Sequence, residues 1–158
     1  MPTPSMEDYL EKIYQISQRK GYARVSDVAQ ALGLQLPSVT RMIQKMGDKD
    51  LVNYEKYGGI VLTDKGQELG QFLHDRHQVL ETLLQLLGVE DEAVIYEDVE
   101  GIEHHISTQT LRQIMKFIRF TQQHPEWMEA YRAFLASEKE MEDDGSEAAL
   151  AKDTPDVK

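Results

Sequence analysis

Six acidic and imidazole side chains, spread over three separate segments of the chain, are of the types that bind metal ions. They lie on three predicted helices: one near the N-terminus, one in the middle and one around residue 100. The six are Asp8, Glu11, His77, Glu100, Glu103 and His104. Carboxylate and imidazole groups suit divalent first-row cations. We therefore expect a metal site that forms only where the three helices meet.

The spacing of these residues favours a site with two cations. Asp8 and Glu11 are three residues apart and so share one face of a helix. Glu100, Glu103 and His104 are related by three and four and also share a face. The four carboxylates balance the charge of two divalent cations, and without metal they would repel one another. Oxygen-rich ligation with some imidazole favours Mn²⁺ or Fe²⁺ over copper.

Ordinary structural roles also account for individual members of the set. Asp8 is placed to be the acid of a helix-capping box opened by Ser5. A single histidine such as His77 is more often a packing or surface residue than a ligand. His74 and His105 compete with the chosen histidines for the ligand roles.

The elements that must position these residues begin with a predicted winged helix-turn-helix. Apolar residues at helical spacing predict a first helix from a Ser5 cap to Gly21 and a second at 27–32, capped by Ser26 and stopped by Gly33. A third helix at 37–47 follows a short turn. Two β-favouring runs, at 51–55 and 60–62, form a predicted hairpin.

Polar and cationic side chains on and beside the third predicted helix suit contact with DNA. Short hydrogen-bonding groups mixed with cations match base edges and phosphates in a major groove, and the hairpin tip would reach the adjacent backbone or minor groove. The candidate DNA-contact residues are Gln35, Ser38, Thr40, Arg41, Gln44, Lys45, Lys56 and Tyr57. Such residues are also typical of the solvated face of a small helical domain.

Helical spacing continues beyond the hairpin, so we expect a mainly α protein. A helix capped by Thr63 is predicted at 64–87, followed by helices at 91–106, 109–123 and 125–137. Residues 138–158 contain eight acids and three lysines, which predicts a flexible acidic tail. The predicted division is a winged-helix domain at 1–63, a linker helix at 64–88, a helical domain at 89–137 and the tail at 138–158.

Composition narrows the functional classes. The 158 residues include no cysteine, which excludes disulfides, thiolate zinc sites and thiol catalysis. The net charge of −11 argues against nucleic acid, but residues 1–70 hold nine basic and nine acidic residues and are neutral. No apolar run approaches the roughly 20 residues that span a bilayer, and no secretory signal is evident. We therefore expect a cytoplasmic protein without membrane contact.

Four stretches of the sequence carry a resemblance to a known family. They are TPSMEDY at 3–9, KGYARVSD at 20–27, YEKY at 54–57 and DVEGIEHH at 98–105. Over roughly residues 1–120 the chain resembles the manganese-responsive branch of the diphtheria-toxin-repressor family of metal-dependent transcriptional repressors. Beyond about Thr121 the sequence departs from that pattern.

The resemblance implies a homodimer in which the helical domain at 89–137 mediates dimerisation and metal binding. It also implies a dinuclear Mn²⁺ site formed by the six residues named above, with Fe²⁺, Co²⁺, Cd²⁺ or Zn²⁺ as possible substitutes. Iron-sensing relatives place Met where this chain has Asp8 and Cys where it has Glu103, and both differences favour the harder Mn²⁺. The expected function is a manganese-activated repressor of manganese-uptake genes, in which metal fixes the dimer geometry for operator DNA.

Three alternatives remain open from the residues. One is a winged-helix regulator that responds to another metal such as iron, or to a small organic ligand. A metallohydrolase could also use carboxylates and histidines around two cations, but the chain has no His-Glu-x-x-His motif and no Gly-rich phosphate loop. The last is an interaction module that does not bind DNA. We expect a protein that is not an enzyme and has no organic substrate.

Overall fold

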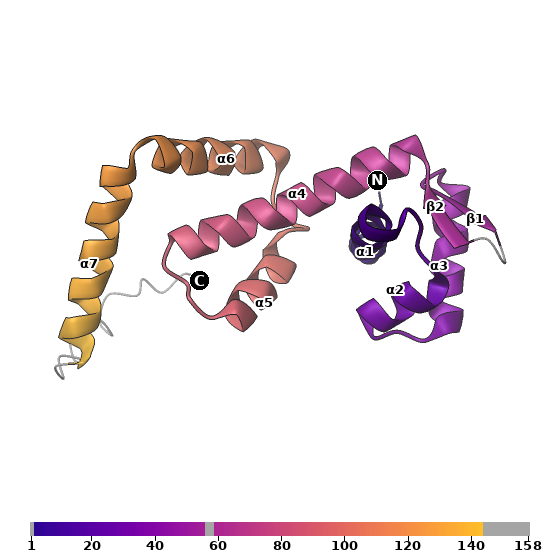
Figure 1. Cartoon of the computed structure of the whole chain (residues 1–158), viewed down its shortest axis with the longest axis horizontal. Helices are drawn as coiled ribbons and strands as arrows, with labels where there is room; N and C mark the ends of the chain where they lie inside the picture. The colour runs from indigo at the N-terminus through magenta and orange to yellow at the C-terminus, as the bar shows by residue number, and fades with distance from the viewer. Residues whose placement is uncertain (1, 56–58, 144–158) are drawn as a thin grey trace, which may run out of the picture.

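The N-terminal half of the computed structural model has three helices followed by a β-hairpin (Figure 1). The structure describes residues 2–55 and 59–143, apart from the side chains of Glu55 and of residues 141–143. The strands pair antiparallel, with Val52 opposite Leu62. This order confirms the predicted winged helix-turn-helix. The elements are α1 (Pro4–Lys20), α2 (Val25–Leu32), α3 (Leu36–Asp48), β1 (Val52–Glu55) and β2 (Gly59–Leu62).

The N-cap of helix α1 lies two residues before the predicted cap. Thr3 is the N-cap, and its hydroxyl accepts a hydrogen bond from the Met6 N–H at 3.4 Å. Ser5, the predicted cap, lies inside the first turn. The reason is Pro4, whose fixed φ and missing N–H suit the first helical position, so the cap falls on the residue before it. Gly21 ends the helix with a φ of 80°, as predicted.

The second helix also begins earlier than predicted. Its N-cap is Arg24, whose N–H donates to the Asp27 carboxylate at 3.2 Å, so Ser26 again lies inside the first turn. The predicted stop at Gly33 is confirmed by its φ of 64°. Apolar side chains from α1, α2, α3 and β2 then form one core. Its fully buried members include Leu10, Ile13, Val28, Val39, Ile43, Met46 and Ile60.

Helix α4 (Asp64–Leu86) starts against the winged helix and runs on into the C-terminal half (Figure 1). The hydroxyl of Thr63 accepts the Gly66 N–H at 3.0 Å and so caps the helix as predicted. Helices α1 and α4 approach closely at Gly70, where an added Cβ would lie 2.8 Å from Tyr14 Cβ. This close approach brings the metal-ligand candidates of α1 and α4 towards each other.

The C-terminal half consists of α5 (Glu92–Ile102), α6 (Thr108–Gln123) and α7 (Pro125–Asp143). Helices α5 and α6 pack on α4, whereas α7 lies at the end of the molecule farthest from the winged helix (Figure 1). Leu80, Ile95 and Val99 are the buried centre of a second core. A mainly α fold with a winged helix followed by an all-helical domain is confirmed. No helix within residues 2–55 and 59–143 is long and apolar enough to cross a membrane.

Two helix ends differ from the sequence prediction by more than one residue. Helix α5 ends at Ile102 rather than at residue 106, because Ser107 caps α6 and the chain must turn before it. The Ser107 hydroxyl accepts the Thr110 N–H at 3.1 Å. Helix α7 continues to Asp143, so residues 138–143 of the predicted tail are helical. The remainder of that tail, 144–158, lies outside the described residues.

Candidate metal centre

The structure brings the six predicted ligands together where α1, α4 and the end of α5 meet. Helix α1 supplies two of them, α4 one and α5 one, and the last two lie in the turn just after α5. Residues from both halves of the molecule therefore surround one site. The six are Asp8, Glu11, His77, Glu100, Glu103 and His104.

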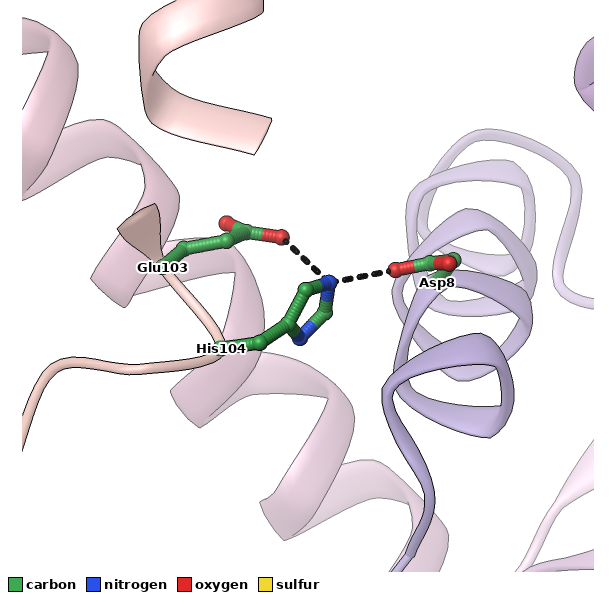
Figure 2. Close-up of side chains that lie close together, drawn as sticks. All are labelled: Asp8, Glu103 and His104. Carbon is green, nitrogen blue, oxygen red and sulfur yellow. Dashed lines mark ion pairs between the residues drawn. The ribbon is translucent and has the colours of Figure 1, made fainter. Parts of the chain in front are cut away.

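One cluster is formed by Asp8, Glu103 and His104 (Figure 2). His104 Nε2 lies 2.8 Å from Asp8 Oδ1 and 3.5 Å from Glu103 Oε1. Asp8 Oδ1 is buried and has no hydrogen-bond partner among the described residues beyond its close contact with His104. A buried oxygen without a hydrogen bond is the kind of atom that a cation satisfies.

A second cluster is formed by Glu11, His77 and Glu103, all of them buried or nearly so. His77 Nδ1 lies 3.0 Å from Glu103 Oε2 and 3.9 Å from Glu100 Oε1. Glu103 thus belongs to both clusters and directs one carboxylate oxygen to each. It is 1% exposed, and it is the residue best placed to bridge two cations.

The electrostatics of the metal-free cluster favour bound protons. Burial raises the pKa of the Asp8 carboxyl above its ordinary value. Burial and the nearby Glu103 charge raise the pKa of Glu11 and of Glu100. Buried carboxylates that repel one another take up protons more readily, and bound cations remove that repulsion.

The two histidines also hold protons more tightly than free imidazole. The hydrogen bond to Glu103 raises the pKa of His77, although burial acts in the opposite direction. For His104, burial alone would lower the pKa, but the hydrogen bond to Glu7 and the charges of Asp8 and Glu103 together outweigh it and raise the pKa. A proton and a cation therefore compete for the same imidazole nitrogens.

A hollow of about 290 Å³ opens beside the candidate ligands, between α1, α2, α4 and α5. It is lined by four of the six ligands together with Gln15 and Tyr96 from α1 and α5. The donor set consists of four carboxylates and two imidazoles. Such a set fits divalent cations that prefer oxygen and nitrogen, and the residues present therefore fit a metal site.

Three polar or charged residues around the ligands were not predicted from the sequence. Glu7 Oε2 lies 3.0 Å from both His104 Nδ1 and an Arg76 guanidinium nitrogen. Neither Glu7 nor Arg76 had a sequence signal beyond standing next to a predicted ligand. Gln15 donates to Glu11 at 3.1 Å. It lies four residues after Glu11 on the same helix, a spacing that could have revealed it.

The other two histidines near the site, His74 and His105, lie at its edge or on the surface. His74 Nδ1 lies 3.7 Å from Glu11 Oε1, at the edge of the second cluster. His105 is exposed. Glu81 lies one helical turn after His77, and its Oε1 is 3.4 Å from His77 Nε2. The pairing of Glu81 with the nitrogen that faces away from Glu103 orients the His77 ring.

Six of the eight candidate DNA-contact residues lie on α3 or just before it. Thr40 is half-buried, and its hydroxyl donates to the Leu36 carbonyl at 2.9 Å, which leaves it less available than the others for a base. Lys56 and Tyr57, predicted at the hairpin tip, lie outside the described residues. Those that are exposed are Gln35, Ser38, Arg41, Gln44 and Lys45.

Comparison with protein families gives matches to both halves of the chain. Residues 1–60 match the model of the iron dependent repressor N-terminal DNA binding domain. Residues 63–130 match the model of the iron dependent repressor metal binding and dimerisation domain. The matched descriptions are those of DNA-binding regulators and not of enzymes, so the metallohydrolase alternative has no support.

Individual relatives agree with these matches. The chain is 48% identical over 140 residues to the HTH-type transcriptional regulator MntR of Listeria welshimeri, covering 89% of this chain and 98% of that protein. Among solved structures it resembles that of the manganese regulator SloR, at 32% identity and a TM-score of 0.64. It also resembles ScaR with bound Zn²⁺, at 28% identity and a TM-score of 0.61. Each likeness covers 75% of this chain, which spans only 55% of the length of each solved chain.

Proposed function

The chain belongs to the iron-dependent repressor family of DNA-binding transcriptional regulators, and we propose that it is activated by Mn²⁺ and represses manganese-uptake genes. The observation that carries this proposal is the position of Glu103, which contributes an oxygen to each of two donor clusters that join α1, α4 and the end of α5. The likeness to the manganese regulator SloR supports the same metal.

The side chains support Mn²⁺ over softer cations. The metal would be held by carboxylate oxygens of Asp8, Glu11, Glu100 and Glu103 and by imidazole nitrogens of two histidines, His77 and His104. Two bound Mn²⁺ ions would supply the positive charge that clustered carboxylates require. None of the donors is a sulfur atom, and hard oxygen donors suit Mn²⁺. Zn²⁺, Cd²⁺, Co²⁺ and Fe²⁺ are compatible substitutes, since similar N/O sites accept several first-row metals.

Ligands from both halves of the molecule explain how metal binding changes the affinity for DNA. Asp8 and Glu11 belong to α1 of the winged helix, whereas Glu103 and His104 belong to the C-terminal half, and His77 lies on the helix that joins them. When all of these residues hold the same ions, the two halves have one fixed orientation. Metal-free molecules would sample several orientations and populate the DNA-binding one only part of the time.

In a homodimer, the orientation of each half sets the distance between the two α3 helices. Recognition helices that read half-sites one helical turn apart need a separation of about 34 Å. Exposed apolar side chains on α6 and α7 support a dimer surface in this region. They are Met115, Phe120, Trp127 and Phe134, each at least 42% exposed.

The exposed face of α3 supports major-groove contact with operator DNA. Arg41 and Lys45 are suited to phosphate, while Gln35, Ser38 and Gln44 are suited to base edges. Lys56 and Tyr57, which the sequence predicts at the hairpin tip, are the further candidates for contact with the neighbouring DNA backbone or minor groove.

A gel-shift titration tests the proposed function. The promoter of a manganese-uptake gene is incubated with the chain and increasing Mn²⁺, Fe²⁺ or Zn²⁺, with a scrambled promoter as the control. We expect a specific shift that appears with Mn²⁺ and is lost when a chelator is added. A shift of full strength without metal would support a regulator of another kind. A shift with Fe²⁺ and none with Mn²⁺ would assign the chain to iron.

A further inference from the structure

The imidazole of His104 is held on both sides by consecutive residues of α1. Its Nε2 lies 2.8 Å from Asp8 Oδ1, and its Nδ1 lies 3.0 Å from Glu7 Oε2. Asp8 and Glu103 are candidate metal ligands beside Nε2, whereas Glu7 is on the opposite side of the ring (Figure 2 shows Asp8, Glu103 and His104). The two ring nitrogens therefore have different surroundings, and Glu7 determines that of Nδ1.

A buried arginine fixes the position of Glu7. An Arg76 guanidinium nitrogen donates to Glu7 Oε2 at 3.0 Å and lies 3.8 Å from Glu103 Oε1. Arg76 is only 7% exposed, and its Nε has no hydrogen-bond partner among the described residues. Because a buried guanidinium must be paired, the ion pair with Glu7 is the main contact that satisfies it. The carboxylate of Glu7 is consequently held against His104.

We propose that Glu7, held in place by Arg76, is a positioning residue for His104: it accepts the Nδ1–H and so leaves Nε2 free to bind metal. This inference rests on the proposed metal-binding function. In metal sites the nitrogen that binds is set by the hydrogen bond that the other nitrogen makes, commonly to a carboxylate. Since Glu7 belongs to the winged helix and His104 to the C-terminal half, the positioning acts across the joint between them.

Arg76 offers the competing arrangement for the same imidazole nitrogen. Its guanidinium nitrogen lies 3.4 Å from His104 Nδ1 and could donate to it, which would place the proton on Nε2. Two observations favour Glu7. Its oxygen is closer, at 3.0 Å, and the same guanidinium nitrogen already donates to Glu7. The competing acceptor for a proton on Nε2 is Asp8 Oδ1, at 2.8 Å, in the space in which a cation would bind.

The first test is the tautomer of His104 in the metal-free wild-type chain. Nitrogen-15 NMR of the histidine rings, at a pH well above the titration midpoint of His104, distinguishes the two neutral forms. The proposal predicts the proton on Nδ1 in the wild type. It also predicts a shift of the proton towards Nε2 when Glu7 is replaced by alanine. A wild-type ring that carries the proton on Nε2 would overturn the proposal without any mutant.

The second test is the affinity for Mn²⁺ alone, measured by the free-ion EPR signal. Loss of such an outer hydrogen bond typically weakens metal binding about 10–100-fold, so we expect that loss for Glu7→Ala. Glu97→Ala, which removes the same charge from an exposed position of α5, is the matched control and should bind as the wild type does. Glu7→Gln keeps an acceptor oxygen and should recover most of the affinity.

The outcomes separate this inference from the proposed function. If the wild type and Glu97→Ala bind no Mn²⁺, the proposed function fails, and the tautomer measurement still decides the role of Glu7. If those two proteins bind Mn²⁺ and a folded Glu7→Ala binds equally well, only the positioning role is overturned. Should Glu7→Ala not fold, because Arg76 loses its partner, Glu7→Gln and the wild-type tautomer decide the question.

Discussion

Glu103 and His77 meet where the end of α5 packs against α4, with Glu103 Oε2 3.0 Å from His77 Nδ1. The Glu103 side chain is 1% exposed and that of His77 is 13% exposed. A buried carboxylate has to be matched by positive charge, here from Arg76 at 3.8 Å together with a protonated imidazole or a bound cation. Protons and metal therefore compete at this contact, and the predictions for metal, pH and mutation depend on that competition.

Replacement of Glu103 by glutamine should remove the response of operator binding to Mn²⁺. The amide keeps the size of the side chain but loses the charge shared by both donor clusters. Allosteric coupling typically changes affinity about 5–150-fold. We therefore expect Mn²⁺ to raise the operator affinity of the wild type within that range and to leave that of Glu103→Gln unchanged. Gel shifts with and without Mn²⁺ measure the change. Glu97→Gln, the same substitution at an exposed position of α5, is the control. A normal Mn²⁺ response in Glu103→Gln would refute the bridging role.

Mn²⁺ should raise the thermal stability of the wild-type chain, and a chelator should reverse the effect. Binding to the folded state alone adds about 2.7 kcal/mol at a ligand concentration one hundred times the dissociation constant. His77→Ala should lose most of this increment, because it removes a donor from the second cluster. Differential scanning fluorimetry measures the midpoint. An equal Mn²⁺ increment in His77→Ala would exclude His77 as a ligand.

The effect of Mn²⁺ should grow as the pH rises. Raised pKa values mean that the folded, metal-free chain holds the His77 and His104 protons more tightly than the unfolded chain does. The stability from these protons is present below the unfolded pKa and is lost as pH rises through the folded pKa. Metal binding requires neutral imidazole rings, so the stability that Mn²⁺ contributes increases as the pH rises.

The stability increment from Mn²⁺ should therefore be larger at about pH 7.5 than at about pH 5.5, on either side of the ordinary histidine pKa. Because the pKa values of Asp8, Glu11 and Glu100 are raised, these carboxyls take up protons at a higher pH than ordinary carboxyls do, and they add to the loss of metal binding as the pH falls. Fluorimetry at several pH values checks this prediction. Equal increments at both ends of the range would mean that no histidine binds the metal.

Removal of the Arg41 charge should reduce the salt dependence of operator binding. Each phosphate contact contributes about 0.9 to the slope of log affinity against log salt, so Arg41→Ala should lower the slope of a dimer by about 1.8. Arg112→Ala, an exposed change on α6, provides the control. Fluorescence anisotropy at several salt concentrations measures the slope. An unchanged slope in Arg41→Ala would indicate that α3 does not approach phosphate through this residue.

Much of the fold was predictable because its helices are amphipathic and the first two end at glycines. The positions of Gly21 and Gly33 indicated the ends of α1 and α2 correctly. Helix starts were less predictable. Thr3 and Ser5 are both good caps, and the choice between them depends on Pro4. Spacing alone could not show that α5 stops at Ile102, since the turn that follows depends on how α6 packs.

The candidate site was predictable in part, for a physical reason. Residues three or four apart on one helix share a face, so the sequence could group Asp8 with Glu11. That all six candidates ligate metal stays a prediction. Glu7 and Arg76 were missed because they are far apart in the sequence and form their ion pair only in the folded chain. Contacts between distant segments of this kind leave no periodic pattern.

The most direct test of the account is the affinity of the wild-type chain for Mn²⁺, measured with and without operator DNA. If ligation fixes the orientation that DNA selects, the operator must tighten Mn²⁺ binding by the same factor by which Mn²⁺ tightens operator binding. We predict equal factors, within about 5–150-fold, from calorimetry of the free and DNA-bound protein. An affinity for Mn²⁺ that is the same in the presence and absence of the operator would contradict the account.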